Sequence, residues 1–441
     1  MRVNKSKMNT PSEPTIALLP WGDLIEDFLD TIGVSFEAFC NEMTGGWMFG
    51  YIEALRLVGV RTVLFCISAR VTEPTRYTHK HTGAKICVLP APSVYHLARR
   101  QMLNPYGWTL EEVFGEVRGI RRPLLAILRD ISPYLATPLG GLARELRREG
   151  CQAILCQEYE YARFDACVLL GQLMRLPVFA TFQGGDFQLS RLERPLRPLS
   201  LRACAGLIVA TQTEAERVQT FYGIPSTKLV QIFNPMDVAN WNALDRSEAR
   251  TVFNIPIDAQ VVVYHGRIEL HRKGLDILMD AWEQVCRDRP GRDLRLLLVG
   301  TGSSADQLRQ RIEAMQLRGV MWVDEYVHDR TRIRQYLSAA DVYTLPSRHE
   351  GFPVAPIEAM ACGLPVVAAD APGVLDILEG GEASGGLVVP RENATALALA
   401  LGRILDNEGW GRELGKRARY RAQSCFSLET IGKQLHDFLL S

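Results

Sequence analysis

Residues 347–365 read Ser-Arg-His-Glu-Gly-Phe-Pro-Val-Ala-Pro-Ile-Glu-Ala-Met-Ala-Cys-Gly-Leu-Pro, and this stretch decides the fold of the chain. Apolar runs at 342–345 and 365–369 flank it, so it joins two predicted strands. Proline suits the first turn of a helix and glycine suits the residue after its end. We therefore expect a short helix from about Pro353 to Gly363. The pattern predicts the strand, loop, helix and strand of a parallel α/β sheet.

Two glutamates in this stretch are candidate site residues, Glu350 in the loop and Glu358 in the helix. The backbone N–H groups of Gly351, Phe352 and Val354 precede the helix, where the positive end of its dipole favours an anion such as phosphate. A carboxylate beside that anion site can accept protons from two sugar hydroxyls. Taken alone, each glutamate is explained equally well without a sugar ligand, as a charge near a helix end or as a solvated side chain.

As a whole, the block from Glu350 to Ala368 resembles the signature of retaining glycosyltransferases of the GT-B fold, family GT4. In that family two glutamates are separated by seven residues, as Glu350 and Glu358 are here. The resemblance implies an α/β protein with two Rossmann-like domains facing each other across a cleft. It also implies that Glu350 is catalytic, that the amides after it bind the donor diphosphate, and that Glu358 binds the ribose.

Length and composition limit the class of protein. A chain of 441 residues is too long for one core and favours two domains or slightly more. Lys plus Arg equals Asp plus Glu at 50 each, so nothing indicates a nucleic-acid partner. Ten cysteines without a Cys-x-x-Cys pair are typical of reduced thiols in a cytoplasmic protein. No apolar run suggests a membrane span or a signal peptide.

An Asn-Pro-Met-Asp turn at 234–237 indicates a domain boundary, although it is also a plain linker signal. The expected segments are a loose tail at 1–14, an acceptor domain at 15–235, a nucleotide-sugar domain at 236–425 and a final helix at 426–441. The resemblance implies that this helix crosses back to the first domain.

The first half alternates strand-like and helical runs, which predicts a parallel sheet with ligands at the carboxyl ends of its strands. The expected strands are 15–20, 61–68, 85–89, 153–155, 177–182, 206–210 and 228–232. In the resembled family a Gly-Gly loop after the first strand approaches the donor diphosphate and the acceptor. Gly45 and Gly46 are the candidates, with an ordinary tight turn as the alternative, because the insertion at 21–43 departs from the usual short spacing.

The segment Phe-Gln-Gly-Gly-Asp at 182–186 follows a predicted strand. The family usually has His-Gly-x-Asp here, so the resemblance makes Gln183 and Asp186 catalytic candidates, with a polar turn as the alternative. Glutamine can form hydrogen bonds but does not titrate near neutral pH. This departure motivates a second hypothesis, a non-catalytic subunit that binds a nucleotide-sugar.

Nine arginines and six acidic residues lie between 98 and 149, interleaved with apolar runs. Such a stretch can lie on an anionic membrane surface, or it can be a solvated helix face over a core. The first interpretation predicts peripheral contact with the inner face of the membrane and admits a lipid-linked acceptor as well as a saccharide.

The segment at 266–274 resembles the family's Gly-Arg … Lys-Gly motif, in which Arg267 and Lys273 would clamp the donor diphosphate. Fixed cations there stabilise the charge that builds on the departing diphosphate. The chain has no Asp-x-Asp pair, the usual carboxylate bracket for a phosphate-bound Mg²⁺ or Mn²⁺. We therefore expect neither a metal nor a cofactor.

Residues 300–305 match the Gly-x-Gly-x-x-Ala dinucleotide fingerprint, which raises a nicotinamide-dependent oxidoreductase as a further alternative. That alternative leaves the block with Glu350 and Glu358 unexplained. The resemblance instead places four residues beside the nucleoside and its base: Gly300, Gly302, Tyr326 and Val327. The expected activity is transfer of a hexose from a UDP- or GDP-sugar to an acceptor hydroxyl with retained anomeric configuration. Its setting would be polysaccharide, glycolipid or glycoconjugate synthesis.

Overall fold

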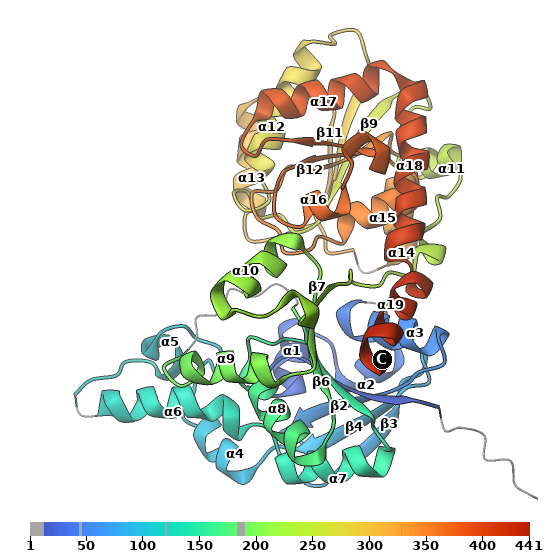
Figure 1. Cartoon of the computed structure of the whole chain (residues 1–441). Helices are drawn as coiled ribbons and strands as arrows, with labels where there is room; N and C mark the ends of the chain where they lie inside the picture. Colours follow the sequence, from blue (N-terminus) through green and yellow to red (C-terminus); the bar gives the residue numbers. More distant parts are fainter. Residues whose placement is uncertain (1–12, 44–45, 120, 183–189, 328) are drawn as a thin grey trace, which may run out of the picture. The chain divides into compact units, whose positions relative to one another are not determined.

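The computed structural model describes residues 13–43, 46–119, 121–182, 190–327 and 329–441 (Figure 1). The chain divides into two compact units. Unit 1 comprises Met1–Ala210, Glu214–Pro235 and Ile431–Ser441, and unit 2 comprises Thr211–Thr213 and Met236–Thr430. Each unit is built around one β-sheet with helices packed on it.

The described part of unit 1 contains an eight-stranded sheet in the order β3-β4-β2-β1-β5-β6-β7-β8. The strands are β1 Thr15–Leu19, β2 Arg61–Ser68, β3 Thr75–Thr78, β4 Lys85–Pro90, β5 Ala153–Cys156, β6 Val178–Thr181, β7 Gly206–Val209 and β8 Leu229–Gln231. All neighbours pair in parallel except β3, which runs antiparallel to β4. Strand β3 was not predicted from the sequence, because this short edge strand is mostly exposed and carries no apolar run.

The core of unit 1 lies where helices cover this sheet. All of β1 is buried, as expected for a central parallel strand that is covered on both faces. Leu142 and Leu146 of α7 and Phe164 of α8 pack into the same hydrophobic cluster as Ala17 of β1. Burial on both faces explains why these strands read as continuous apolar runs.

The helices of unit 1 are α1 Ile25–Thr31, α2 Phe36–Asn41, α3 Gly46–Leu57, α4 Ser93–Arg99, α5 Leu110–Phe114, α6 Arg121–Leu135, α7 Leu139–Glu149, α8 Ala162–Met174, α9 Glu193–Ala203 and most of α10 Gln212–Tyr222. The insertion at 21–43 thus contains α1 and α2. The last helix, α19 Leu428–Leu440, contributes most of its length to unit 1. Its Phe438 ring lies 5.3 Å from that of Phe179 in β6, and Gly432 packs on the Ala54 carbonyl of α3.

Unit 2 has a six-stranded parallel sheet in the order β11-β10-β9-β12-β13-β14 among its described residues. The strands are β9 Gln260–His265, β10 Leu294–Val299, β11 Val320–Val323, β12 Val342–Leu345, β13 Val366–Ala369 and β14 Gly386–Val389. The helices are α11 Arg246–Val252, α12 Leu275–Arg287, α13 Ala305–Ala314, α14 Arg330–Ser338, α15 Ala355–Ala361, α16 Val374–Ile377, α17 Ala394–Asp406 and α18 Glu408–Phe426. Two α/β units with this strand pattern confirm the predicted Rossmann-like fold class.

Helix α15 begins two residues later than predicted. Val354 is its N-cap, and the amides of Ile357 and Glu358 donate to the Val354 carbonyl. Pro356 rather than Pro353 therefore occupies the first turn, where the missing N–H costs nothing. Past the other end, Gly363 has φ +78°, which suits the glycine predicted to stop the helix.

Among the described residues, no helix has both the length and the apolar character needed to cross a membrane.

Candidate active site

The candidate site lies at the carboxyl edge of the unit 2 sheet, where β9 and β12 are neighbours. From β9 the chain moves outward through β10 to β11, and from β12 it moves the other way through β13 to β14. The loops that leave β9 and β12 therefore lie at the point where the strand order reverses. In sheets of this kind a ligand usually binds in a crevice at that point, and we call this part of unit 2 the crevice.

The two loops are joined by close backbone contacts. The Arg348 amide donates to the Arg272 carbonyl over 3.0 Å, and Nη1 of Arg348 donates to the His271 carbonyl over 2.6 Å. Gly274 has φ +63°, and a Cβ placed on it would lie 2.0 Å from the carbonyl oxygen of Pro346. Only glycine allows this approach, so the loops are fixed against each other.

This contact brings together two predicted site residues, Lys273 and Glu350. Nζ of Lys273 lies 2.8 Å from Oε1 and 2.9 Å from Oε2 of Glu350. The side chains are only 15% and 8% exposed, so loss of either partner would leave a costly unpaired charge. An ammonium group has three N–H donors, so Lys273 can bind a further anion while it holds Glu350.

Glu358 is held by His265, which was not predicted as a site residue. Oε2 of Glu358, in α15, lies 2.7 Å from Nε2 of His265, the last residue of β9. The His265 ring is buried, and its Nδ1 has no hydrogen-bond partner in the described part of the chain. The available signal was its position directly before the Gly-Arg pair at the end of a strand.

A second ion pair that was not predicted from the sequence holds the Glu350 loop to helix α12. Nη1 and Nη2 of Arg348 donate to the two carboxylate oxygens of Asp276 over 2.7 and 2.8 Å. Burial raises the pKa of Asp276, but the hydrogen bonds and charge of Arg348 outweigh burial and hold that pKa below its ordinary value. Asp276 lies in the first turn of α12, so the pair ties this helix to the loop.

The remaining predicted residues occupy the same edge of the sheet but are less enclosed. Arg267 follows β9, its side chain is 64% exposed, and its Nη1 lies 3.3 Å from Oε1 of Glu269. Tyr326 follows β11 and is exposed, while Val327 beside it is half-buried. The structure therefore joins Lys273 with Glu350 but leaves Arg267 on the surface.

Packing between two loops explains why residues 300 and 302 are glycines. A Cβ on Gly300 would lie 2.0 Å from the Gly266 carbonyl oxygen, and one on Gly302 would lie 2.4 Å from that of Ile268. These glycines let the turn after β10 pack against the loop after β9. The Gly-x-Gly match thus marks a packing contact between two loops.

The segment between Glu350 and α15 is fixed from another side. A Cβ on Gly373 would lie 2.2 Å from the Gly351 carbonyl oxygen, so the turn after β13 packs directly on that residue. The Phe352 ring lies 6.1 Å from that of Phe426. Val354 caps the helix, as described above.

Three further candidates, Gly45, Gln183 and Asp186, lie outside the described residues. Gly46 is the first residue of α3. Searched over the described ranges, the chain has no group of three or more His, Cys, Asp or Glu side chains that could hold a metal ion.

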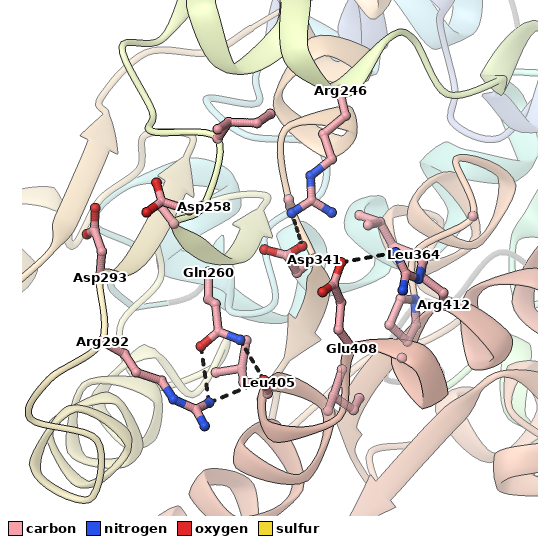
Figure 2. Close-up of a pocket in the computed structure, with 17 residues that line it drawn as sticks. Arg246, Asp258, Gln260, Arg292, Asp293, Asp341, Leu364, Leu405, Glu408 and Arg412 are labelled. Atoms are coloured by element: carbon pink, nitrogen blue, oxygen red, sulfur yellow. Dashed lines mark hydrogen bonds and ion pairs between the residues drawn. The ribbon is translucent and has the colours of Figure 1, made fainter.

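Unit 2 also has a pocket of about 380 Å³ at the opposite edge of its sheet (Figure 2). Gln260 at the start of β9 and Asp341 just before β12 line it, so it lies at the amino ends of the strands. Four of its charged side chains pair with one another: Arg246 lies 2.6 Å from Asp341, and Arg412 donates to Glu408 over 3.2 Å (Figure 2). This pocket is therefore distinct from the crevice that holds Lys273 and Glu350.

Comparison with known protein families covers most of both units. Residues 77–240 match the model described as Glycosyltransferase Family 4. Residues 259–407, which contain every element of the crevice, match the model described as Glycosyl transferases group 1. The chain belongs to glycosyltransferase family 4.

Curated relatives of this family 4 chain include a D-inositol 3-phosphate glycosyltransferase of Kineococcus radiotolerans. It is 31% identical over 237 residues, which cover 51% of this chain and 54% of the relative. A D-inositol 3-phosphate glycosyltransferase of Nocardia farcinica is 30% identical over 217 residues, 48% of this chain and 47% of the relative. The chain thus spans about half the length of the curated relatives it matches.

Solved structures match nearly the whole family 4 chain and identify the fold as GT-B. A sucrose-phosphate synthase from Thermosynechococcus elongatus has a TM-score of 0.64 at 22% identity, covering 96% of this chain and 98% of that one. Anabaena Alr3699/HepE in complex with UDP has a TM-score of 0.67 at 17% identity, covering 96% and 99%. At these identities the likeness concerns the fold alone.

Proposed function

We propose that this family 4 chain transfers a hexose from a UDP- or GDP-sugar to an acceptor hydroxyl with retained anomeric configuration. The observation that carries the proposal is the buried Lys273–Glu350 pair at the switch point of the unit 2 sheet. A structural neighbour supports a nucleotide-sugar donor, because Anabaena Alr3699/HepE was solved with UDP and with UDP-glucose.

Donor binding follows from the arrangement of the crevice. The remaining N–H donors of Lys273, the exposed guanidinium of Arg267 and the amides after Glu350 would bind the diphosphate. Glu358, oriented by His265, would accept protons from the ribose hydroxyls. The exposed Tyr326 ring would lie beside the base, with Val327, Gly300 and Gly302 around the nucleoside.

In the proposed transfer, the bond between the anomeric carbon and the phosphate oxygen breaks on the face where the acceptor oxygen bonds. The leaving phosphate takes the acceptor's proton, so no dedicated protein base is required. Lys273 stabilises the charge on the departing diphosphate, and Glu350 fixes the position of that ammonium group. Gln183 and Asp186 would position the sugar and the acceptor. The proposed reaction uses no metal ion, because cationic side chains stabilise the departing diphosphate.

We also propose that unit 1 contacts an anionic membrane. Within the arginine-rich stretch at 98–149, we assign this contact to α5 and α6. Part of that stretch is structural, because buried Glu145 and Glu149 of α7 pair with Arg76 and with Arg61 at the sheet. Helix α6 instead extends away from the sheet (Figure 1). It exposes a stripe of apolar residues, Leu124, Ile127 and Ile131. A cytoplasmic protein peripheral to the inner face of the membrane fits this surface.

A screen of UDP- and GDP-sugars tests the function, with binding followed by calorimetry and the product anomer by NMR. We expect one donor to bind and the product to keep its configuration, with activity unchanged by EDTA. Inversion, or loss with EDTA restored by Mn²⁺, would contradict the mechanism. If wild type binds donor without transfer or hydrolysis and Gln183→His gains activity, the chain is a binding subunit.

The Glu358 assignment has its own test. Glu358→Ala should weaken the donor and the free nucleoside diphosphate alike, by about 1–3 kcal/mol, because a charged hydrogen bond is lost. Glu413→Ala, which removes an exposed glutamate on α18, is the matched control and should leave both affinities unchanged. Equal affinities for wild type and Glu358→Ala would show that this carboxylate does not contact the ribose.

A further inference from the structure

Unit 1 contains a cavity of about 600 Å³ that has no role in the proposed donor binding. Its walls include four aromatic side chains, Trp21, Tyr106, Trp108 and Tyr161, and we call it the aromatic pocket. The volume is within the range that holds small organic ligands.

The aromatic pocket lies at the switch point of the unit 1 sheet. From β1 the chain moves outward through β2 to β4, and from β5 it moves the other way through β6 to β8. Trp21 follows β1 and Tyr161 follows β5, and their ring centroids are 5.9 Å apart. The pocket therefore occupies in unit 1 the position that the Lys273–Glu350 crevice occupies in unit 2.

The aromatic walls are held in place by buried hydrogen bonds. The Tyr106 hydroxyl donates to Asp27 over 2.9 Å, and the Tyr161 hydroxyl donates to Asp23 over 2.7 Å. Trp21 stacks on Tyr106 with ring centroids 5.2 Å apart. Ring planes that are fixed before a ligand arrives lower the entropic cost of binding.

The charges around the pocket leave a positive excess. Among its acids, Asp130 accepts from Arg129 over 2.9 Å, and Glu193 accepts from Arg197 over 3.2 Å. Arg191 and Arg194 line the pocket and are exposed, and neither has a carboxylate partner within the described ranges. Guanidinium groups of this kind pair with phosphate or carboxylate oxygens.

We propose that the aromatic pocket binds the acceptor, and that this acceptor is a saccharide that carries an anionic group. The apolar faces of the sugar ring pack on Trp21 and its aromatic neighbours, and Arg191 and Arg194 bind the phosphate or carboxylate. This inference rests on the proposed function, since it names the substrate class of the same reaction.

Calorimetry on the full chain tests the pocket with three probes: glucose 6-phosphate, glucuronate and glucose. We expect one or both charged sugars to bind more tightly than glucose, and their affinity to fall with added salt. The comparison of glucose 6-phosphate with glucuronate separates phosphate recognition from carboxylate recognition. Equal binding of glucose and both charged sugars would overturn the role of the arginines, and no binding by either charged sugar would overturn the proposal.

Two double variants locate the binding. Arg191→Gln with Arg194→Gln should weaken the charged sugar by about tenfold to a hundredfold, the loss typical of charged hydrogen bonds, and leave UDP binding unchanged. Arg147→Gln with Arg148→Gln removes the same charge from exposed positions on α7 and should change neither. An equal loss of affinity for the charged sugar in both double variants would show that only net charge matters, and would contradict binding in the pocket.

The outcome also separates this inference from the proposed function. If UDP or a UDP-sugar binds and neither charged sugar does, the pocket assignment is wrong and the proposed function stands. If a charged sugar binds through Arg191 and Arg194 while no nucleotide-sugar binds or turns over, the pocket stands and the proposed transfer is wrong.

Discussion

At the scale of single residues, the site depends on pairs formed by residues far apart in the sequence. Lys273 and Glu350 are 77 positions apart, and Asp276 and Arg348 are 72 apart. Each pair joins the segment after β9 to the segment after β12. The polar groups of the crevice therefore hold one another in place before a substrate binds.

The Asp276–Arg348 pair gives a prediction about acid stability. Because the folded pKa of Asp276 lies below its ordinary value, the pair stabilises the protein above that ordinary value, and the stabilisation is lost as pH falls through the folded pKa. Asp276→Asn should lower the free energy of unfolding at pH 7 by about 1–3 kcal/mol and flatten its decline below about pH 4. Urea unfolding of wild type and variant, at pH 7 and in the range below about pH 4, measures both effects on the free energy of unfolding.

Asp306→Asn is the control, since Asp306 forms an exposed pair with Arg309 that should contribute little. If Asp276→Asn and Asp306→Asn have the same effect on the free energy of unfolding at pH 7, the Asp276–Arg348 pair does not stabilise the fold.

At the scale of elements, the loops at the carboxyl edge of unit 2 are fixed by glycines that let backbones touch. Gly274 against Pro346 and Gly300 against Gly266 are the closest of these contacts beside the crevice. The position of Lys273 therefore depends on its neighbour in sequence as well as on Glu350.

Gly274→Ala should disturb both stability and donor binding. The new Cβ would overlap the Pro346 carbonyl, and φ +63° is strained for alanine, so we expect a loss of about 2 kcal/mol or more and weaker UDP binding. Gly291→Ala, where a Cβ meets open space, is the matched control. Thermal unfolding and calorimetry would contradict the argument if the two variants behave alike.

The exposed stripe on α6 is tested by liposome sedimentation. Leu124→Ser with Ile127→Ser should reduce binding to anionic vesicles, because these side chains are 67% and 55% exposed and would insert at the surface. Leu169→Ser with Leu173→Ser changes two exposed leucines on α8 and should have no effect. Equal binding of wild type to neutral and anionic vesicles, or none to either, would favour a solvated helix face.

Strands with a continuous apolar run were predicted from sequence with correct or nearly correct ends, as 61–68 for β2 and 15–20 for β1 show. Local patterns failed where tertiary pairing decides, as in the polar strand β3 and in the start of α15. The motif at 266–274 predicted Lys273 as a site residue. It gave no sign of the Glu350 partnership or of the aromatic pocket, because both arise from contacts between distant segments.

At the scale of the whole molecule, the two units share one plan, in which the proposed ligand site lies where the strand order reverses. All ten cysteines are free thiols, and eight are buried within these units. Burial raises the pKa of Cys40, Cys87 and Cys204 to about 11, and that of Cys362 to about 12. Buried and protonated thiols react slowly.

This burial predicts a small number of labelled cysteines in the folded protein. At pH 8 a maleimide should label Cys286 and Cys425, which are partly exposed, before the other eight. In urea all ten should react, because unfolding removes the burial that raises their pKa values. Peptide mass spectrometry of both samples measures the pattern, and rapid labelling of Cys362 or Cys204 in the native protein would contradict it.

The return of α19 to unit 1 has a consequence for biosynthesis. Phe438 packs on Gly206 and Phe179, yet the ribosome makes it only after every residue of unit 2. Unit 2 is a continuous segment apart from Thr211–Thr213, whereas unit 1 also needs the segment Ile431–Ser441. Unit 1, although begun first, is therefore completed last, and the surface of Gly206 and Phe179 that Phe438 covers stays open until all of unit 2 has been synthesised.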